Sequence, residues 1–187
     1  GAVGREHRGQ RGLLRALAGA SRLRIGVCWL LTPEDGGGDG ELRAYLTQPG
    51  KWRRYDAELY EALCRLLQDG INRNVRHARD WGLVPGAEYF EAILADGAAA
   101  RQEYFSEAWE RLADRELLFL DPDNGIEVSS PPWAGRGSSR YIYWRELKAA
   151  FSRGHSLLIY QHYPHAPRER FVPFLADRIA EELGCSR

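Results

Sequence analysis

The chain has 187 residues, of which 44% are hydrophobic and 28% are charged, a composition typical of a folded globular domain rather than a disordered or fibrous chain. The 26 Lys and Arg residues balance the 26 Asp and Glu residues, which excludes a uniformly basic nucleic-acid coat but not a local basic patch. No apolar run approaches the roughly 18 residues that a membrane-spanning helix needs, so the sequence predicts no membrane span.

Residues 1–22 differ in composition from the rest of the chain, because they combine many glycines with five arginines and a single acid, Glu6. We expect a basic Gly/Arg-rich leader with one short helix around residues 13–17. The leader is either a solvated segment or an arm that contacts nucleic-acid phosphates. Residues 23–187 are predicted to form a single domain.

Residues 23–187 alternate between apolar runs and amphipathic segments. Clear strands are predicted over residues 23–31, 116–120 and 156–160, the first two of them buried, and weaker strands over residues 71–78 and 88–94. Helices are predicted at residues 41–46, from an N-cap at Asp56 to Gly70, from Gly97 past Leu112, from Trp144 to Gly154, and from Pro167 to Gly184. This alternation is typical of βαβ units and predicts a three-layer Rossmann-like α/β domain with a mostly parallel sheet.

The three cysteines, Cys28, Cys64 and Cys185, are widely spaced and form no Cys-x-x-Cys pair. This pattern matches neither a disulfide framework nor a zinc site. It predicts reduced structural thiols and a cytoplasmic location. The oligomeric state is left open.

Polar residues follow each of the three clear strands. Ligands of an open parallel sheet bind outside the carboxyl ends of its strands, so these residues are candidates for a site at one edge of the sheet. After the first strand come Thr32 and a glycine-rich loop with Gly36, Gly38 and Asp39; after the second come Asp121, Asp123, Asn124 and Glu127; after the third come Gln161, His162 and His165.

The run Asp121-Pro122-Asp123-Asn124-Gly125 is the most informative of these groups. It puts one carboxylate at the end of the strand and a second carboxylate after a single proline. Such a run fits an ordinary Asx turn, but it also fits hydrogen bonding to a polar substrate or the binding of Mg²⁺. A magnesium-dependent nuclease or phosphoryl-transfer enzyme would use Asp121, Asp123 and Glu127 as ligands.

The run Leu117–Pro122 followed by Gly125 resembles the substrate-side motif of class I S-adenosylmethionine-dependent methyltransferases that act on nucleic acids, in which a strand ends in Asp-Pro-Pro-Tyr. The likeness covers residues 101–162. Asp123-Asn124 replaces the Pro-Tyr pair, and no G-x-G-x-x-G follows the first strand. Bacterial and phage proteins without an assigned activity also resemble the chain in this region.

The resemblance implies a nucleotide or nucleic-acid substrate and S-adenosylmethionine as cofactor. The cofactor would then lie near Thr32, Gly36, Gly38 and Asp39. Asp121, Asp123, Asn124 and His162 would be the catalytic residues: Asp121 and Asn124 orient a substrate amine or hydroxyl, and His162 assists proton transfer.

Two other classes of function stay open. A restriction-type nuclease would pair Asp123 with Glu146 and Lys148, but two residues that are two apart on a helix diverge by about 200°. A non-catalytic domain would keep the sheet edge as a ligand groove.

The segment Lys51-Trp52-Arg53-Arg54 combines an aromatic ring with three cations. This pattern is common on the edge of a surface helix, but it also fits contact with a nucleic acid or nucleotide. We therefore expect any nucleic-acid partner to bind through this segment and the Arg-rich leader.

Overall fold

The computed structural model describes residues 3–33, 46–68, 79, 80, 82, 84–163 and 166–185. It divides into two compact units, one of residues 1–24 with 34–87 and the other of residues 25–33 with 88–187. The predicted strand at residues 71–78 and nearly all of the predicted helix at residues 41–46 lie outside the described residues.

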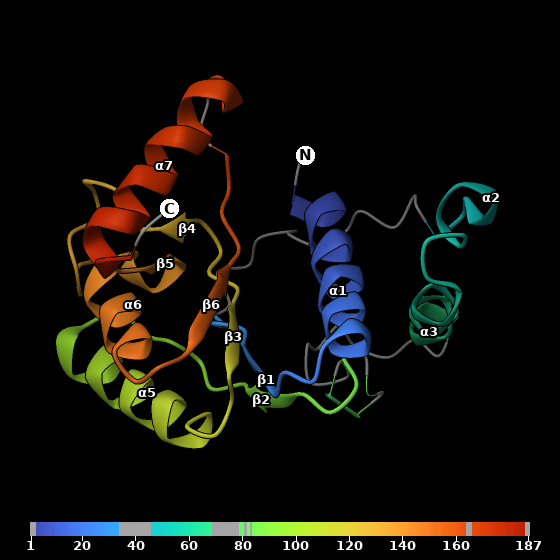
Figure 1. Ribbon diagram of the computed structural model, residues 1–187, viewed down its shortest axis with the longest axis horizontal. Coiled ribbons are helices and arrows are strands. Elements are labelled where there is room, and N and C mark those ends of the chain that lie inside the picture. Colours follow the sequence, from blue (N-terminus) through green and yellow to red (C-terminus); the bar gives the residue numbers. More distant parts are fainter. Residues whose placement is uncertain are drawn as a thin grey trace. The chain divides into compact units, whose positions relative to one another are not determined.

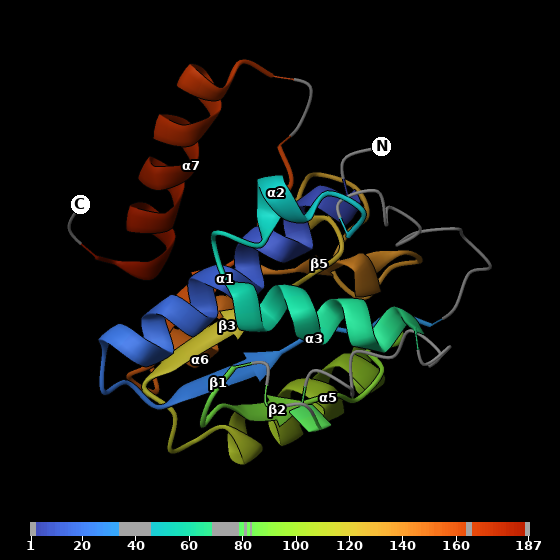
Figure 2. The ribbon, with the colours of Figure 1, turned by 90° about the vertical axis from the view of Figure 1, so that its right-hand side faces the viewer.

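The second unit is built on a parallel sheet of four strands, β1 (Ile25–Cys28), β2 (Glu88–Phe90), β3 (Leu117–Leu120) and β6 (Ser156–Ile159). Their order in the sheet is β2-β1-β3-β6, and Figure 2 shows β1 and β3 side by side with the same direction. Every residue of β1 and β3 is buried, as continuous apolar runs predict. The three clear strands and the weaker strand at residues 88–94 are confirmed.

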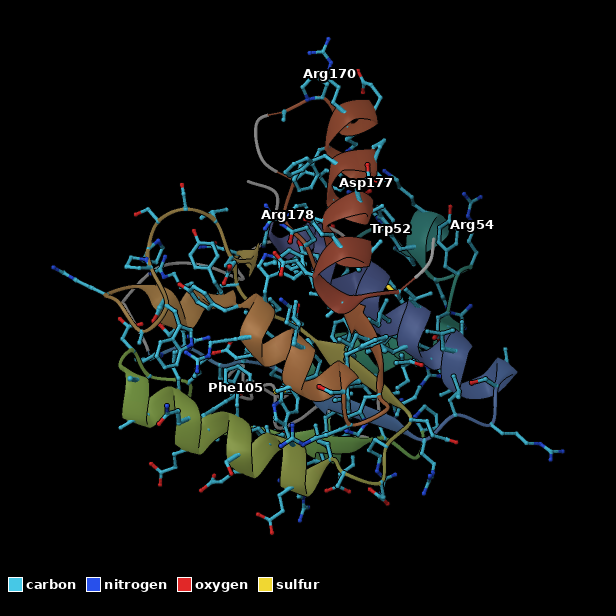
Figure 3. The ribbon with its side chains drawn as sticks, turned by 60° about the vertical axis from the view of Figure 1, so that its left-hand side comes forward. Trp52, Arg54, Phe105, Arg170, Asp177 and Arg178 are labelled. Carbon is cyan, nitrogen blue, oxygen red and sulfur yellow. The ribbon has the colours of Figure 1, made fainter. Side chains whose placement is uncertain are left out.

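Helices α5 (Ala98–Arg111) and α6 (Trp144–Phe151) cover one face of this sheet (Figure 1). Leu118 and Leu120 of β3 pack there with Phe105 and Trp109 of α5 and Leu147 of α6. Figure 3 shows Phe105 between the two helices. The fold class is thereby confirmed as a Rossmann-like α/β fold with a mostly parallel sheet.

Helix α7 (Arg168–Leu183) packs on α6, where Lys148 Nζ lies 2.6 Å from a carboxylate oxygen of Glu182. It begins after Pro167 and ends at Gly184, which has a φ of 67°, as the sequence predicts. Pro173 lies inside the helix. Among the described helices, none is long and apolar enough to span a membrane.

Between β3 and α6 the chain forms two short strands that the sequence does not predict. β4 (Gly125–Ile126) pairs in parallel with β5 (Tyr141–Ile142), and a 3-10 turn, η1 (Ser138–Arg140), leads into β5. Two residues are too few to carry a periodic pattern, so this pairing depends on tertiary contacts.

The first unit contains α1 (Val3–Ala20), α2 (Pro49–Trp52) and α3 (Ala57–Gln68). The expected short helix at residues 13–17 is wrong in length, because α1 has 18 residues. Arg15 of α1 donates hydrogen bonds to Asp56 at 2.6 Å and to Glu58 at 2.8 Å, so the leader is held to the start of α3. Asp56 also accepts the Leu59 N–H at 2.9 Å, which confirms it as the N-cap of α3.

Candidate functional site

The carboxyl ends of the strands lie level with one another. In the register of the sheet, Cys28 pairs with Leu120 and Leu120 pairs with Ile159. The ladder runs one residue further, because Asp121 N donates to Cys28 O at 3.1 Å and Tyr160 N donates to Leu120 O at 2.9 Å. The polar residues after β1, β3 and β6 therefore leave the same edge of the sheet.

The strand order reverses between β1 and β3. Counting outward from β1, β2 lies on one side and β3 with β6 on the other. In open α/β sheets this reversal opens a crevice in which ligands bind. Thr32, which follows β1, donates a hydrogen bond of 2.9 Å from its hydroxyl to the Asp123 carboxylate, which follows β3. Two predicted site residues are thus in direct contact at the switch point.

Asp121 and Asp123 have different surroundings although one residue separates them. Asp121 is buried, with 7% of its surface exposed, whereas Asp123 is exposed. The charge of Asp121 acts on the neighbouring thiol of Cys28. The pKa of Cys28 is raised to about 11, because burial and, to a smaller extent, the charge of Asp121 outweigh the lowering effect of the hydrogen bonds with Tyr104 and Leu30. Cys28 is therefore a protonated structural thiol at neutral pH.

Gln161 joins the end of β6 to the turn after β3. Its Oε1 accepts the Ile126 N–H at 2.8 Å, and its Nε2 donates to His162 O at 2.8 Å. The Gln161 side chain lies so close to Gly125 that a Cβ there would meet Gln161 Oε1 at 2.5 Å. Gly125 also has a φ of 96°, which disfavours any other residue. Gln161 and Gly125 together hold the acidic turn in place.

His162 lies beyond this link and is half-buried, with its ring 4.8 Å from that of Tyr160 in an edge-to-face arrangement. It leaves the same sheet edge as Asp121, one strand away. His165 lies outside the described residues, as do the predicted cofactor residues Gly36, Gly38 and Asp39.

The backbone N–H groups of Asn124 and Glu127 bond to the chain around β5. Asn124 N donates to Arg140 O at 2.9 Å, and Glu127 N donates to Ile142 O at 2.8 Å. Burial raises the pKa of Glu127, and the charges of Glu146 and Glu182 raise it as well, against the lowering effects of Trp144 N–H and Arg178. The Glu127 carboxylate therefore interacts with residues of α6 and α7.

The predicted magnesium set of Asp121, Asp123 and Glu127 is not assembled. Over the part of the chain that the structure describes, no group of three or more His, Cys, Asp or Glu side chains could hold a metal ion. The nuclease pair also separates: Glu146 is buried against Arg101, and Lys148 pairs with Glu182.

A buried ion pair holds the loop that follows the acidic turn. Arg101 donates to Glu146 at 2.9 and 2.7 Å, to Ser138 O at 2.8 Å and to Tyr141 O at 3.1 Å. Glu146 accepts two more hydrogen bonds, from Trp133 Nε1 at 3.0 Å and from the backbone N of Tyr143 at 2.9 Å. This network positions β5, and through β5 it positions the turn that carries Asn124.

Two further residues at the sheet edge were missed by sequence reasoning. Leu30, two residues after β1, has a φ of 47°, a conformation that non-glycine residues rarely adopt and that is found more often at functional sites. No sequence signal identifies it. Glu91 follows β2 directly, as Asp121 follows β3, and that shared position is a signal that could have identified it.

Comparison with protein-family models found no match, and searches of curated proteins and of solved structures found no significant similarity.

Proposed function

We propose that this protein is a small Rossmann-like enzyme that acts on a nucleotide or nucleic acid, with a methyltransferase-like core. The observation that carries the proposal is the position of Asp121-Pro122-Asp123 at the strand-order reversal, where Asp123 contacts Thr32 at 2.9 Å. An Asp-Pro pair that ends a strand beside β1 is the feature that the chain shares with the methyltransferase motif.

Asp121 is the residue that would act on the substrate. Its backbone N–H donates a hydrogen bond to Cys28 O, so the sheet holds the backbone from which the carboxylate extends. Only 7% of the Asp121 surface is exposed. A hydrogen bond from a substrate amine or hydroxyl to this carboxylate would therefore be stronger than in water. Asp121 would thereby orient the nucleophile and stabilise the positive charge that develops on it as it attacks the methyl group.

The neighbouring residues would complete the site. Asn124 would offer an amide to the same substrate group, and His162 would carry the released proton away. Thr32 and Asp123, joined to each other, would line the side toward the cofactor. S-adenosylmethionine, when bound, would supply an activated methyl group.

Ligand-induced thermal stabilisation tests this proposal. A ligand present at 100 times its Kd stabilises a protein by about 2.7 kcal/mol, which at this size is a rise in Tm of roughly 5–11 °C. We expect such a rise with S-adenosylmethionine, and a similar rise in Asp121→Asn, because the proposal has Asp121 contact the substrate and not the cofactor. A rise with Mg²⁺ but none with S-adenosylmethionine would overturn the proposal in favour of a metal-dependent enzyme. A rise with neither ligand would favour a non-catalytic binding domain.

A further inference from the structure

The segment from Lys51 to Tyr55, at the end of α2, presents aromatic rings together with cations. The Trp52 and Tyr55 ring centroids are 6.3 Å apart, and Tyr55 is 70% exposed. Lys51 Nζ lies 4.9 Å from the centre of the Trp52 ring, and Arg54 Cζ lies 4.9 Å from that of Tyr55. Figure 3 shows Trp52 and Arg54 on this segment.

The structure shows which of the three predicted cations could pair with a ligand. Arg53 gives two of its N–H groups to Glu61, at 2.9 and 2.6 Å, so its charge is already paired. Arg54 keeps its hydrogen bond local, to the Tyr55 hydroxyl at 2.9 Å. The group that could meet a ligand is therefore Lys51, Trp52, Arg54 and Tyr55, which we call the α2 platform.

The backbone of the α2 platform is held by local hydrogen bonds. Arg53 N donates to Pro49 O at 3.0 Å, and Tyr55 N donates to Trp52 O at 3.2 Å. These turns hold the backbone that carries the two rings, so little ordering of the backbone would be required on binding.

We infer that the α2 platform binds single-stranded nucleic acid, with bases stacked on its rings and phosphates paired with Lys51 and Arg54. Single-strand sites commonly combine stacking rings with cations, because unpaired bases expose their faces whereas duplex bases do not. This inference rests on the proposed function, since it identifies the form of nucleic acid on which the protein acts.

The surroundings of the α2 platform favour a narrow anionic ligand. Exposed carboxylates follow it along the chain in α3, at Glu58, which pairs with Arg15, and at Glu61, which pairs with Arg53. A wide anionic surface such as a membrane would meet these carboxylates as well as the cations, whereas a single strand presents one line of phosphates. A membrane-binding helix also needs several turns of amphipathic character, and α2 has four residues.

Binding of a fluorescently labelled 12-nucleotide poly-dT strand, followed by anisotropy, tests the inference on the full chain. We expect Tyr55→Ala to weaken binding by about tenfold, as loss of one stacked base typically does. The double variant Lys51→Gln/Arg54→Gln should lower the slope of log K against log salt by about 1.4, at roughly 0.7 for each phosphate contact. The matched control, Arg53→Gln/Glu61→Gln, keeps the net charge and should bind within about twofold of the parent.

Three results would overturn the inference: no binding of the strand by the parent, equal loss in the control variant, or a duplex bound as tightly as the single strand. Binding to anionic phosphatidylserine vesicles without binding to the strand would assign the α2 platform to a membrane. Strand binding that depends on Tyr55, in a parent that transfers no methyl group, would support this inference and overturn the proposed function alone.

Discussion

The hydroxyl of Thr32 donates a 2.9 Å hydrogen bond to the carboxylate of Asp123, which lies 91 positions later in the sequence. This bond ties the end of β1 to the end of β3 at the reversal of the strand order. It gives the exposed carboxylate of Asp123 a partner within the protein, whereas Asp121 is the buried carboxylate of the pair. The two acids are therefore expected to play different roles.

Asp121→Asn should separate chemistry from folding. Asn keeps the shape of Asp and the ladder bond of its backbone, so Tm should stay within a few degrees of the parent. Methyl transfer to a nucleic-acid mixture should fall by roughly two orders of magnitude, because Asn lacks the negative charge that would orient and stabilise the nucleophile in the transition state. Asp123→Asn, which keeps an oxygen for Thr32, should lose less activity. Full activity in Asp121→Asn would disprove its catalytic role, and an unfolded variant would make Asp121 structural.

The buried pair of Arg101 and Glu146 should be essential to stability. Replacing Arg101 with Met leaves the Glu146 charge buried without its main partner, a change that costs about 3–5 kcal/mol and lowers Tm by roughly 6–20 °C. Thermal melting measures this loss. The double variant Arg101→Met/Glu146→Gln should recover part of it, because no charge is left behind.

An exposed ion pair provides the control for that experiment. Arg53→Gln, which breaks the surface pair with Glu61, should change stability by less than about 1 kcal/mol. Similar losses for Arg53→Gln and Arg101→Met would show that burial does not set the strength of these pairs.

Gly125→Ala should destabilise the site turn for two separable reasons. The φ of 96° costs a non-glycine residue about 1–3 kcal/mol, and the new Cβ would collide with the Gln161 side chain. Adding Gln161→Ala removes the collision and leaves the backbone strain. A double-mutant cycle on the free energy of unfolding should therefore give a coupling above about 0.5 kcal/mol. Strict additivity would mean that Gln161 does not press on Gly125.

Asp96 should make stability depend on acidic pH. Burial alone would raise its pKa, but hydrogen bonds from Gly137 N at 2.6 Å and Ser139 N at 2.8 Å outweigh burial and hold the pKa below its ordinary value of 3.8. A lowered pKa stabilises the folded state above pH 3.8, and this contribution is lost as the pH falls through the folded pKa.

Asp96→Asn tests this pH dependence. The variant should be less stable than the parent at pH 7, by about 1 kcal/mol for a lost hydrogen bond. The difference in Tm between the two proteins should shrink as the pH falls below 3.8. A constant difference across this range would contradict the assignment.

The sequence by itself determined three of the four strands of the main sheet and the ends of two helices. Apolar runs predicted β1, β3 and β6, and the capping signals at Asp56 and Gly184 marked helix ends that the structure confirms. These signals succeed because each depends on residues a few positions apart. The rule that parallel strands end at one edge then brought Asp121 and His162 to the same edge.

Tertiary structure alone decided how those residues are joined. The bonds from Thr32 to Asp123 and from Arg101 to Glu146 connect residues 91 and 45 positions apart. Such pairs produce no periodic pattern in the sequence, because the two partners lie on different elements and far apart along the chain. The strands β4 and β5 depend on these contacts as well, and the predicted metal set fails because Glu127 follows β4 away from the acidic turn. Local patterns set the longer strands and several helix ends, but only packing across the fold decides which side chains meet.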